Sequence, residues 1–299
     1  MATIDILIPS YGRATTLAVT LASLIGQSFR DSRIVISDQN DYFNLEMLPE
    51  ISAALRVLRS HGHTVEIYKH LPRLGMAEQR HFLLEQATAP YSLFLDDDVI
   101  LEPDVVQRML AAIRAAGCGF VGSALHGLSY LRDQRPHQQA IELWTGPVEP
   151  ELVQFGDPAW ARHMLHNAAN LYHVQQRLCR SPEDQYLYKV AWVGGCVLYD
   201  TAKLRMVGGF EFWQALPADH CGEDVLAQLR VMAHFGGCGL LPSGAYHQEL
   251  PTTVPDRRTN APEVLPITVP LRQPGSAVRP STPVAGAGPR GGRAGVRGA

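Results

Sequence analysis

The sequence predicts an α/β fold built on a mostly parallel sheet with helices on both faces. In the first hundred residues, short apolar runs typical of buried strands alternate with segments whose apolar residues recur at helical spacing. Strands that alternate with helices form parallel sheets covered on both faces. Several polar groups directly follow an expected strand. In such sheets, ligands bind beyond the carboxyl ends of the strands.

The expected elements alternate along the chain. We expect strands at residues 4–8, 34–36, 65–68 and 91–95. The first of these strands ends at Pro9. We expect helices at residues 17–25, 45–58 and 75–87. In the first of these helices, leucines recur every three or four residues and form the face that covers the sheet.

Three consecutive aspartates, Asp96, Asp97 and Asp98, follow the last of these strands. Their carboxylates repel one another, and a divalent cation such as Mg²⁺ or Mn²⁺ relieves this repulsion with the oxygen ligands that it prefers. The alternative is that they cap the next helix. That helix begins near Pro103, several residues further on. The pattern therefore favours a metal or phosphate site over an idle acidic turn.

Other polar groups are expected to converge with the aspartates. Residues 10–13 and Asp38 also follow strands, so their side chains should reach the same edge of the sheet. Arg80 lies within the apolar stripe of its helix, beside Met76 and Leu84. A guanidinium there either binds an anionic ligand, pairs with a nearby aspartate or extends to water.

Three further groups lie in the second half of the chain. Gly194 and Gly195 precede a strand, where two glycines either let a ligand approach the backbone or form an ordinary turn. Glu223 and Asp224 open an amphipathic helix, whose dipole favours carboxylates there and also keeps a general base ionised. His247 is a lone histidine, for which metal ligation is one alternative to an exposed or satisfied side chain.

The composition indicates a soluble globular enzyme. Of 299 residues, 46% are hydrophobic and 18% charged, and the formal net charge of −3 does not favour a nucleic-acid binder. No run approaches 18 apolar residues and the N-terminus lacks a signal-peptide layout, so we expect no transmembrane segment. Five cysteines without a CxxC pair indicate reduced thiols in the cytoplasm.

Two regions lack the strand–helix alternation. Residues 123–189 have mixed periodicity, and this segment is either a recognition insert or part of the scaffold. From residue 251 onward, proline, glycine, threonine and arginine replace the apolar periodicity, so we expect residues 251–299 to form an extended, largely disordered tail. Its arginines could also make peripheral contact with an anionic membrane surface.

Nine short motifs occur in the order found in family 2 of the glycosyltransferases, and the chain resembles that family over roughly residues 3–125 and 190–250. The first five motifs are 6–13 (ILIPSYGR), 23–29 (SLIGQSF), 34–38 (IVISD), 75–80 (GMAEQR) and 94–98 (FLDDD). The other four are 194–195 (GG), 207–211 (VGGFE), 222–224 (GED) and 246–247 (YH). The resemblance implies the GT-A fold, which is Rossmann-like, with an acceptor-side insert.

The resemblance also implies roles on the donor side. The aspartate segment resembles the DXD motif of the family, with Asp98 as a direct ligand of Mn²⁺ or Mg²⁺ and Asp96 or Asp97 facing the ribose or the donor sugar. Asp38 resembles the aspartate that hydrogen-bonds the nucleobase. The other residues assigned to donor binding are Pro9, Ser10, Tyr11, Arg13, Arg80, Gly194 and Gly195.

The implied catalytic residues lie in the second half of the chain. Asp224 resembles the catalytic base, with Glu223 in contact with the acceptor or the donor, and His247 resembles the histidine that joins the metal shell. Residues 1–122 would then form the nucleotide-sugar-binding half and residues 123–250 the acceptor-binding, catalytic half.

The implied reaction is an inverting, metal-dependent transfer of a sugar from a nucleoside diphosphate, with a UDP-sugar favoured. The acceptor is a glycan, a lipid-linked molecule or a small molecule. His81 departs from the family, because many relatives carry asparagine there. No Gln-x-x-Arg-Trp motif follows Asp224, which favours the addition of one or a few sugars over processive synthesis.

Two other functions compete with this reading. A sugar nucleotidyltransferase also uses a parallel sheet and metal-binding aspartates, but residues 9–13 contain only one glycine and one basic residue for a phosphate loop. The other is a non-catalytic nucleotide-binding protein on a degenerate transferase fold. Retention of both acidic clusters counts against it.

Overall fold

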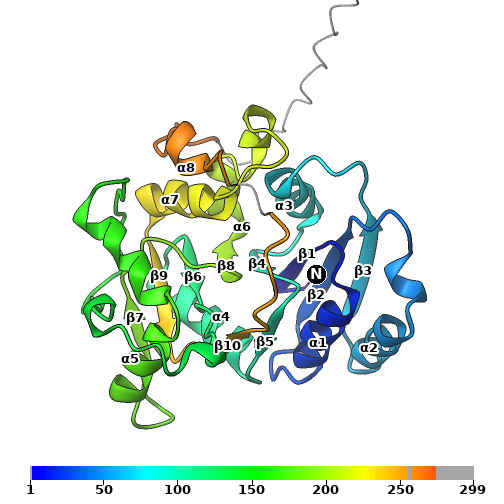
Figure 1. The fold of residues 1–299 in the computed structure, drawn as a ribbon, viewed down its shortest axis with the longest axis horizontal. Coiled ribbons are helices and arrows are strands. Elements are labelled where there is room, and N and C mark those ends of the chain that lie inside the picture. The colour runs from blue at the N-terminus through cyan, green and yellow to red at the C-terminus, as the bar shows by residue number, and fades with distance from the viewer. Residues whose placement is uncertain (1, 255–256, 274–299) are drawn as a thin grey trace, which may run out of the picture.

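The apolar segments of the first hundred residues form four neighbouring strands, as the alternation predicts. They are β1 (Ile4–Ser10), β2 (Ser32–Asp38), β3 (Thr64–Lys69) and β4 (Tyr91–Leu95). They lie in the order β3-β2-β1-β4, and all three pairings are parallel. The computed structural model describes residues 2–254 and 257–273, whose arrangement is drawn in Figure 1.

Further strands extend the sheet to eight, in the order β3-β2-β1-β4-β8-β6-β9-β7. The added strands are β6 (Phe120–Gly122), β7 (Tyr186–Tyr188), β8 (Cys196–Asp200) and β9 (Gly237–Leu241). β8 is antiparallel to both of its neighbours, β6 and β9 are parallel, and β7 is antiparallel to β9. A separate two-stranded ribbon pairs β5 (Val99–Leu101) with β10 (Ala245–His247).

Helices cover both faces of the sheet. One face packs on α1 (Ala14–Ile25), α2 (Pro49–Ser60) and α4 (Val105–Ala116). The other packs on α3 (Met76–Gln86), α6 (Thr201–Met206) and α7 (Glu223–Phe235). Neighbouring residues of a strand point to opposite faces, so Ile6 and Ile8 pack in the first layer and Leu7 in the second. The predicted fold class is confirmed.

The expected helix at residues 45–58 is interrupted at its start. Residues Leu45–Met47 form a single 3₁₀ turn, and Leu48 is extended. The α-helix begins at Pro49, because the fixed φ of proline suits the first helical position and its missing N–H costs nothing there. Among the described residues, no helix combines the length and apolar character needed to cross a membrane.

The segment at residues 123–189 contains short helices separated by irregular chain. They are the 3₁₀ helices Leu128–Tyr130, Pro136–Gln138 and Pro158–His166, and the α-helix α5 (Asn170–Leu178). Short helices of this kind leave no sustained periodicity in a sequence. The remaining 3₁₀ helix is Glu211–Ala215.

The chain after residue 251 differs from the expected tail. Residues 257–273 are described, and they include the short helix α8 (Ala261–Val264), which lies beside α7 in Figure 1. Leu265, Ile267 and Val269 pack against the second core layer. Partial burial of these three side chains stabilises the extended segment on that surface. The rest of the tail prediction, residues 274–299, lies outside the described residues.

Candidate active site

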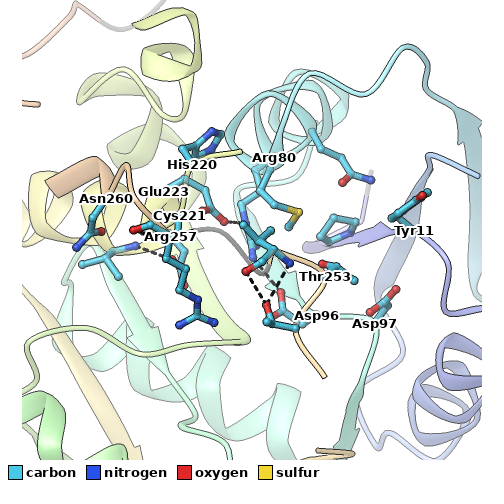
Figure 2. Close-up of a pocket in the computed structure, with 18 of the residues that line it drawn as sticks. Tyr11, Arg80, Asp96, Asp97, His220, Cys221, Glu223, Thr253, Arg257 and Asn260 are labelled. Atoms are coloured by element: carbon cyan, nitrogen blue, oxygen red, sulfur yellow. Dashed lines mark hydrogen bonds and ion pairs between the residues drawn. The ribbon is translucent and has the colours of Figure 1, made fainter. Parts of the chain in front are cut away.

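A cavity of about 820 Å³ opens at the carboxyl ends of β1 and β4. Its wall comes from the loop after β1, helix α3, the segment after β4, the start of α7 and the chain after β10 (Figure 2). Most of the site residues predicted from the sequence line it: Pro9, Ser10, Tyr11, Arg13, Arg80, Asp96, Asp97, Asp98, Glu223, Asp224 and His247. Parallel α/β sheets bind ligands at this edge.

Asp38 lies beside this cavity rather than on its wall. It is opposite Ser10 in the register of β1 and β2, and it is 1% exposed. Its Oδ1 accepts hydrogen bonds from the backbone N and side-chain Nδ2 of Asn40, at 2.9 and 2.7 Å, and Lys69 Nζ donates to Oδ2 at 3.0 Å. Asn40 Oδ1 in turn accepts from Gly12 N at 2.7 Å. Asp38 therefore supports the loop after β1 through Asn40.

Gly194 and Gly195 also lie outside the cavity wall. The backbone N of Asp96 donates to the carbonyl of Gly195 at 2.9 Å. Gly195 has a φ of +75°, and a Cβ there would lie 2.4 Å from Leu125 Cδ1 and 3.4 Å from Asp96 Oδ2. Because a side chain would collide with Leu125, glycine allows the backbone at this position to support Asp96.

Arg80 joins the two acidic clusters. Its Nη2 donates to Asp96 Oδ1 at 2.9 Å and its Nε donates to Glu223 Oε1 at 3.0 Å. Burial by itself lowers the pKa of Arg80, but the carboxylates of Asp96, Glu223 and Asp224 outweigh burial and raise that pKa. The sequence left open whether Arg80 binds a ligand, pairs with an aspartate or extends to water. In the structure, it pairs with carboxylates of the protein.

Asp97 points toward the loop after β1. Ser10 Oγ donates to Asp97 Oδ2 at 2.8 Å, and Arg13 Nη1 lies 3.5 Å from Asp97 Oδ1. Burial raises the pKa of Asp97 to about 7, and the charges of Asp98 and Asp96 add to this effect. The hydrogen bond from Ser10 and the charge of Arg13 oppose it.

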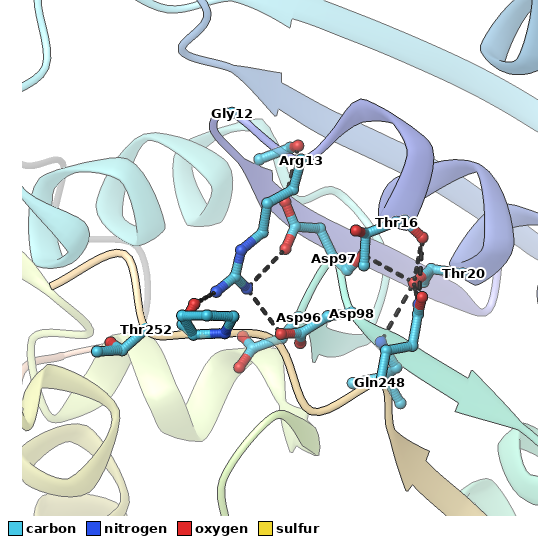
Figure 3. Close-up of polar contacts among 12 residues, drawn as sticks. Gly12, Arg13, Thr16, Thr20, Asp96, Asp97, Asp98, Gln248 and Thr252 are labelled. Carbon is cyan, nitrogen blue, oxygen red and sulfur yellow. Dashed lines mark hydrogen bonds and ion pairs between the residues drawn. The ribbon is translucent and has the colours of Figure 1, made fainter.

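Asp98 meets a guanidinium and an imidazole. Arg13 Nη1 donates to Asp98 Oδ2 at 2.6 Å (Figure 3), and His247 Nε2 lies 3.3 Å from the same oxygen. Burial raises the pKa of Asp98, but the hydrogen bond and charge of His247 and the charge of Arg13 outweigh it, so the pKa is lowered. The same hydrogen bond raises the pKa of His247. The β5–β10 ribbon, which pairs His247 with Val99, creates this contact.

Asp224 lies in the first turn of α7, on the cavity wall. Its Oδ1 accepts a hydrogen bond from the backbone N of Val225 at 2.9 Å. Burial, together with repulsion from Glu223, raises the pKa of Asp224 to about 7, while Arg80 opposes the shift. A carboxyl group with this pKa exchanges protons near neutrality, as a general base must.

The chain after β10 forms a part of the wall that the sequence did not predict. Leu250, Thr252 and Arg257 face the cavity. Gln248 Nε2 donates to the carbonyl of Thr16 at 3.2 Å, and Arg13 Nη2 donates to the carbonyl of Pro251, so this segment is tied to the start of α1 (Figure 3). The composition of the sequence predicted a tail from residue 251 onward. The polar contacts that attach this segment could not be predicted, because they leave no periodic pattern in the sequence.

Two tryptophans on the wall were also not predicted as site residues. Trp160 lies in the 3₁₀ helix Pro158–His166, and Trp192 lies in the loop before β8. Asn260, Pro262 and Glu263 also line the cavity. The sequence signal that could have indicated them is that one tryptophan lies within residues 123–189, which have no clear periodicity, and the other lies just after them.

Arg80→Gln should destabilise the fold by about 3 kcal/mol at neutral pH, because it leaves buried carboxylates without their cation. The loss should shrink as pH falls, because acid removes negative charge from the cavity and with it the need for a compensating cation. Chemical denaturation of the wild type and the variant at neutral and acidic pH measures this loss of unfolding free energy. Arg56→Gln, on the exposed face of α2, is the control and should have little effect. Equal losses for Arg80→Gln at both pH values would contradict the electrostatic role.

Comparison with solved structures identifies a similar fold. The crystal structure of S. aureus TarS 1-349 superposes with a TM-score of 0.51 at 15% sequence identity. The match covers 83% of this chain and 60% of that one. At this identity the similarity concerns the fold.

Comparison of sequences identifies the family. The chain is 27% identical over 167 residues to the succinoglycan biosynthesis protein ExoM of Rhizobium meliloti (strain 1021), which covers 53% of this chain and 47% of that protein. It is 30% identical over 168 residues to validoxylamine A glucosyltransferase of Streptomyces hygroscopicus subsp. jinggangensis (strain 5008), covering 54% and 37%. The chain thus spans about half or less of these relatives. Residues 5–176 match glycosyl transferase family 2, more than half of the sequence, and the chain belongs to that family.

Proposed function

We propose that the protein is an inverting glycosyltransferase that moves a sugar from a nucleoside-diphosphate sugar to an acceptor hydroxyl. Membership of glycosyl transferase family 2 supports sugar transfer. The observation that carries the proposal is that one cavity holds both Asp224 and the pair of Asp98 and His247. A proton acceptor and a site for a diphosphate are the two parts that this reaction needs.

In this proposal, the two halves of the chain have different roles. Residues 1–122 bind the donor, with the nucleotide along the loop that holds Ser10, Tyr11 and Arg13. The support that Asp38 gives to this loop suits a binding surface that must keep its shape. Residues 123–250 supply the acceptor side and the base. One relative is named a glucosyltransferase, so UDP-glucose is the donor to test first.

In the proposed reaction, an acceptor hydroxyl oxygen attacks the anomeric carbon from the face opposite the leaving group. The bond between that carbon and the diphosphate oxygen breaks, and its electron pair leaves with the nucleoside diphosphate. Asp224 takes the hydroxyl proton. Because the new bond forms on the opposite face, the anomeric configuration inverts. Arg80 binds Glu223 and Asp96, which balances the negative charge of two carboxylates near the proton acceptor.

The residues present fit a divalent cation that is shared with a diphosphate. Asp98 offers a carboxylate and His247 an imidazole, but no group of three or more such side chains is arranged to hold a metal ion anywhere in the described residues. Mg²⁺ and Mn²⁺ often take one or two carboxylates and complete their shells with phosphate oxygens and water. Asp98 and His247 would hold the ion, which when bound would neutralise charge on the leaving diphosphate. Arg13 brings a second positive charge to the same place.

Asp224→Asn should lower the rate of transfer by about 10²–10⁴, because it removes the proton acceptor and keeps the shape of the side chain. The affinity for UDP-glucose should not change. Release of UDP, followed with and without acceptor, measures the rate, and calorimetry measures the affinity. Glu85→Gln, an exposed carboxylate on α3, is the matched control. Transfer at the normal rate by the Asp224→Asn protein would overturn the assignment of the base.

The wild-type kcat/KM should rise with pH through about 7 and then level off, because Asp224 accepts a proton only when it is ionised and burial raises its pKa to about 7. Glu223→Gln should move the midpoint to lower pH, since repulsion from Glu223 helps to raise that pKa. A pH–rate profile of each protein tests both points. A midpoint near the ordinary carboxyl value in the wild type would contradict the proposal.

Asp98→Ala should abolish the part of donor affinity that depends on the metal. UDP binding by calorimetry, with Mn²⁺ and after chelation, separates this part from the rest. In the wild type, Mn²⁺ should tighten UDP binding, because it would lie between the carboxylate and the phosphates. In the variant, the two conditions should give the same affinity. If Mn²⁺ strengthens binding equally in both proteins, Asp98 does not hold the ion.

A further inference from the structure

Three aromatic side chains lead away from the cavity on the side of α7. The rings of Trp192 and Trp160 have centroids 5.0 Å apart at an interplanar angle of 56°, and the ring of Phe155 lies 5.5 Å beyond Trp160 at 75°. Trp192 and Trp160 line the cavity that contains Asp224. We call Trp192, Trp160 and Phe155 the aromatic track.

The inner part of the track is held in place by polar contacts. Gln228 of α7 makes two hydrogen bonds to the backbone of Val193. Gln228 Oε1 accepts from Val193 N, and Gln228 Nε2 donates to the carbonyl of Val193, each at 2.8 Å. His163 stacks on Trp192 at 4.9 Å and 8°, and its Nδ1 lies 2.7 Å from the carbonyl of Trp160. These contacts fix both indole rings before any ligand arrives, which reduces the entropy cost of binding.

The outer end of the track enters a second cavity. This cavity, of about 670 Å³, is lined by Gln154, Phe155, Thr268 and the chain after α8. It shares Pro262 and Glu263 with the first cavity, so the two are neighbours. The track therefore runs from the wall that holds Asp224 to a second depression on the surface.

Phe155 is far more exposed than a structural role requires. It is 72% exposed, although a phenylalanine gains most of its stabilising effect from burial. Exposed aromatic side chains that continue a cavity are typical of ligand-binding grooves. Asn260 and Glu263 also line the first cavity, and Glu263 lines the second one together with Phe155. Asn260 Nδ2 donates to Glu263 Oε1 at 2.7 Å.

The chemistry of the track suits a carbohydrate better than an alkyl chain. A pyranose ring has apolar C–H faces that stack on aromatic rings and hydroxyl edges that need hydrogen-bonding partners. A cavity lined by tryptophans, an amide and a carboxylate offers both kinds of contact. An alkyl chain would bring Asn260 and Glu263 against hydrocarbon and leave these groups desolvated without compensation.

We infer that the acceptor is an oligosaccharide of more than one sugar, which lies along the aromatic track. Its terminal sugar stacks on Trp192 and Trp160 and presents a hydroxyl to Asp224, and the preceding sugars continue over Phe155 into the second cavity. This inference rests on the proposed function, because it names the acceptor of that reaction. It gives part of the segment at residues 123–189 a recognition role.

Binding of the full chain, saturated with UDP, to an array of immobilised mono- to hexasaccharides tests the inference. The wild type should bind one series of glycans more tightly as the chain grows beyond one sugar. Phe155→Ala should weaken binding of the longer members about tenfold and leave the monosaccharide unchanged. Trp160→Ala should weaken all members, and Trp160→Phe should restore part of the binding.

The matched control is Tyr130→Ala, an exposed aromatic residue in the same segment that lines neither cavity. It should bind like the wild type. Thermal melting of each variant with and without UDP shows that it is folded and still binds nucleotide. Phe155 is mostly exposed, so its removal should not lower the melting temperature appreciably.

Three results would overturn the inference: no glycan on the array binds, monosaccharides bind as tightly as longer chains, or Phe155→Ala binds long chains normally. A small-molecule acceptor, or a lipid that carries no more than one sugar, would give the first or second result. These outcomes are separate from failure of the proposed function. If the wild-type protein releases no UDP from UDP-glucose, the result counts against sugar transfer. If it transfers sugar but does not depend on the length of the acceptor, the result counts against the aromatic track alone.

Discussion

Compensation of negative charge at the edge of the sheet is the constraint on which the site depends. Residues 96–98 and 223–224 bring five carboxyl groups to one cavity, where repulsion is poorly screened. Arg80 is only 5% exposed and bonds to one carboxylate of each cluster, which joins the end of β4 to the start of α7. Without a cation between them, the two segments could approach only if some carboxylates were protonated.

The same compensation gives the carboxyl groups different chemistry. Asp98 faces Arg13 and His247, and its pKa is lowered, so it stays charged and suits a cation or a diphosphate bound through one. Burial and repulsion from Glu223 raise the pKa of Asp224 to about 7, and the charge of Arg80, whose hydrogen bonds go to Glu223 and Asp96, only partly opposes this. Environments that separate the pKa values of nearby acids allow one site to combine charge stabilisation with proton transfer.

Sequence patterns predicted the parts of the site that follow regular elements. Asp96 and Ser10 directly follow or end buried strands, so topology alone places them at the same edge. Patterns could not show that Asp38 acts through Asn40, or that Gly195 supports Asp96 from behind, because both depend on tertiary contacts. Trp160 was missed as a site residue because 3₁₀ helices leave no periodic signal, and the chain after residue 251 was missed because isolated polar contacts attach it.

Helix α7 links the two sides of the cavity. Residues 5–176 carry the family match, so Asp224 lies outside it, and the case for this base rests on geometry rather than on membership. Asp224 and Gln228 are one turn apart on α7 and point to the same side of the helix. Gln228 holds the peptide of Val193 and with it the loop of Trp192. A displacement of α7 would therefore move the proposed base and the aromatic wall together, which would keep the acceptor that we propose in register with that base.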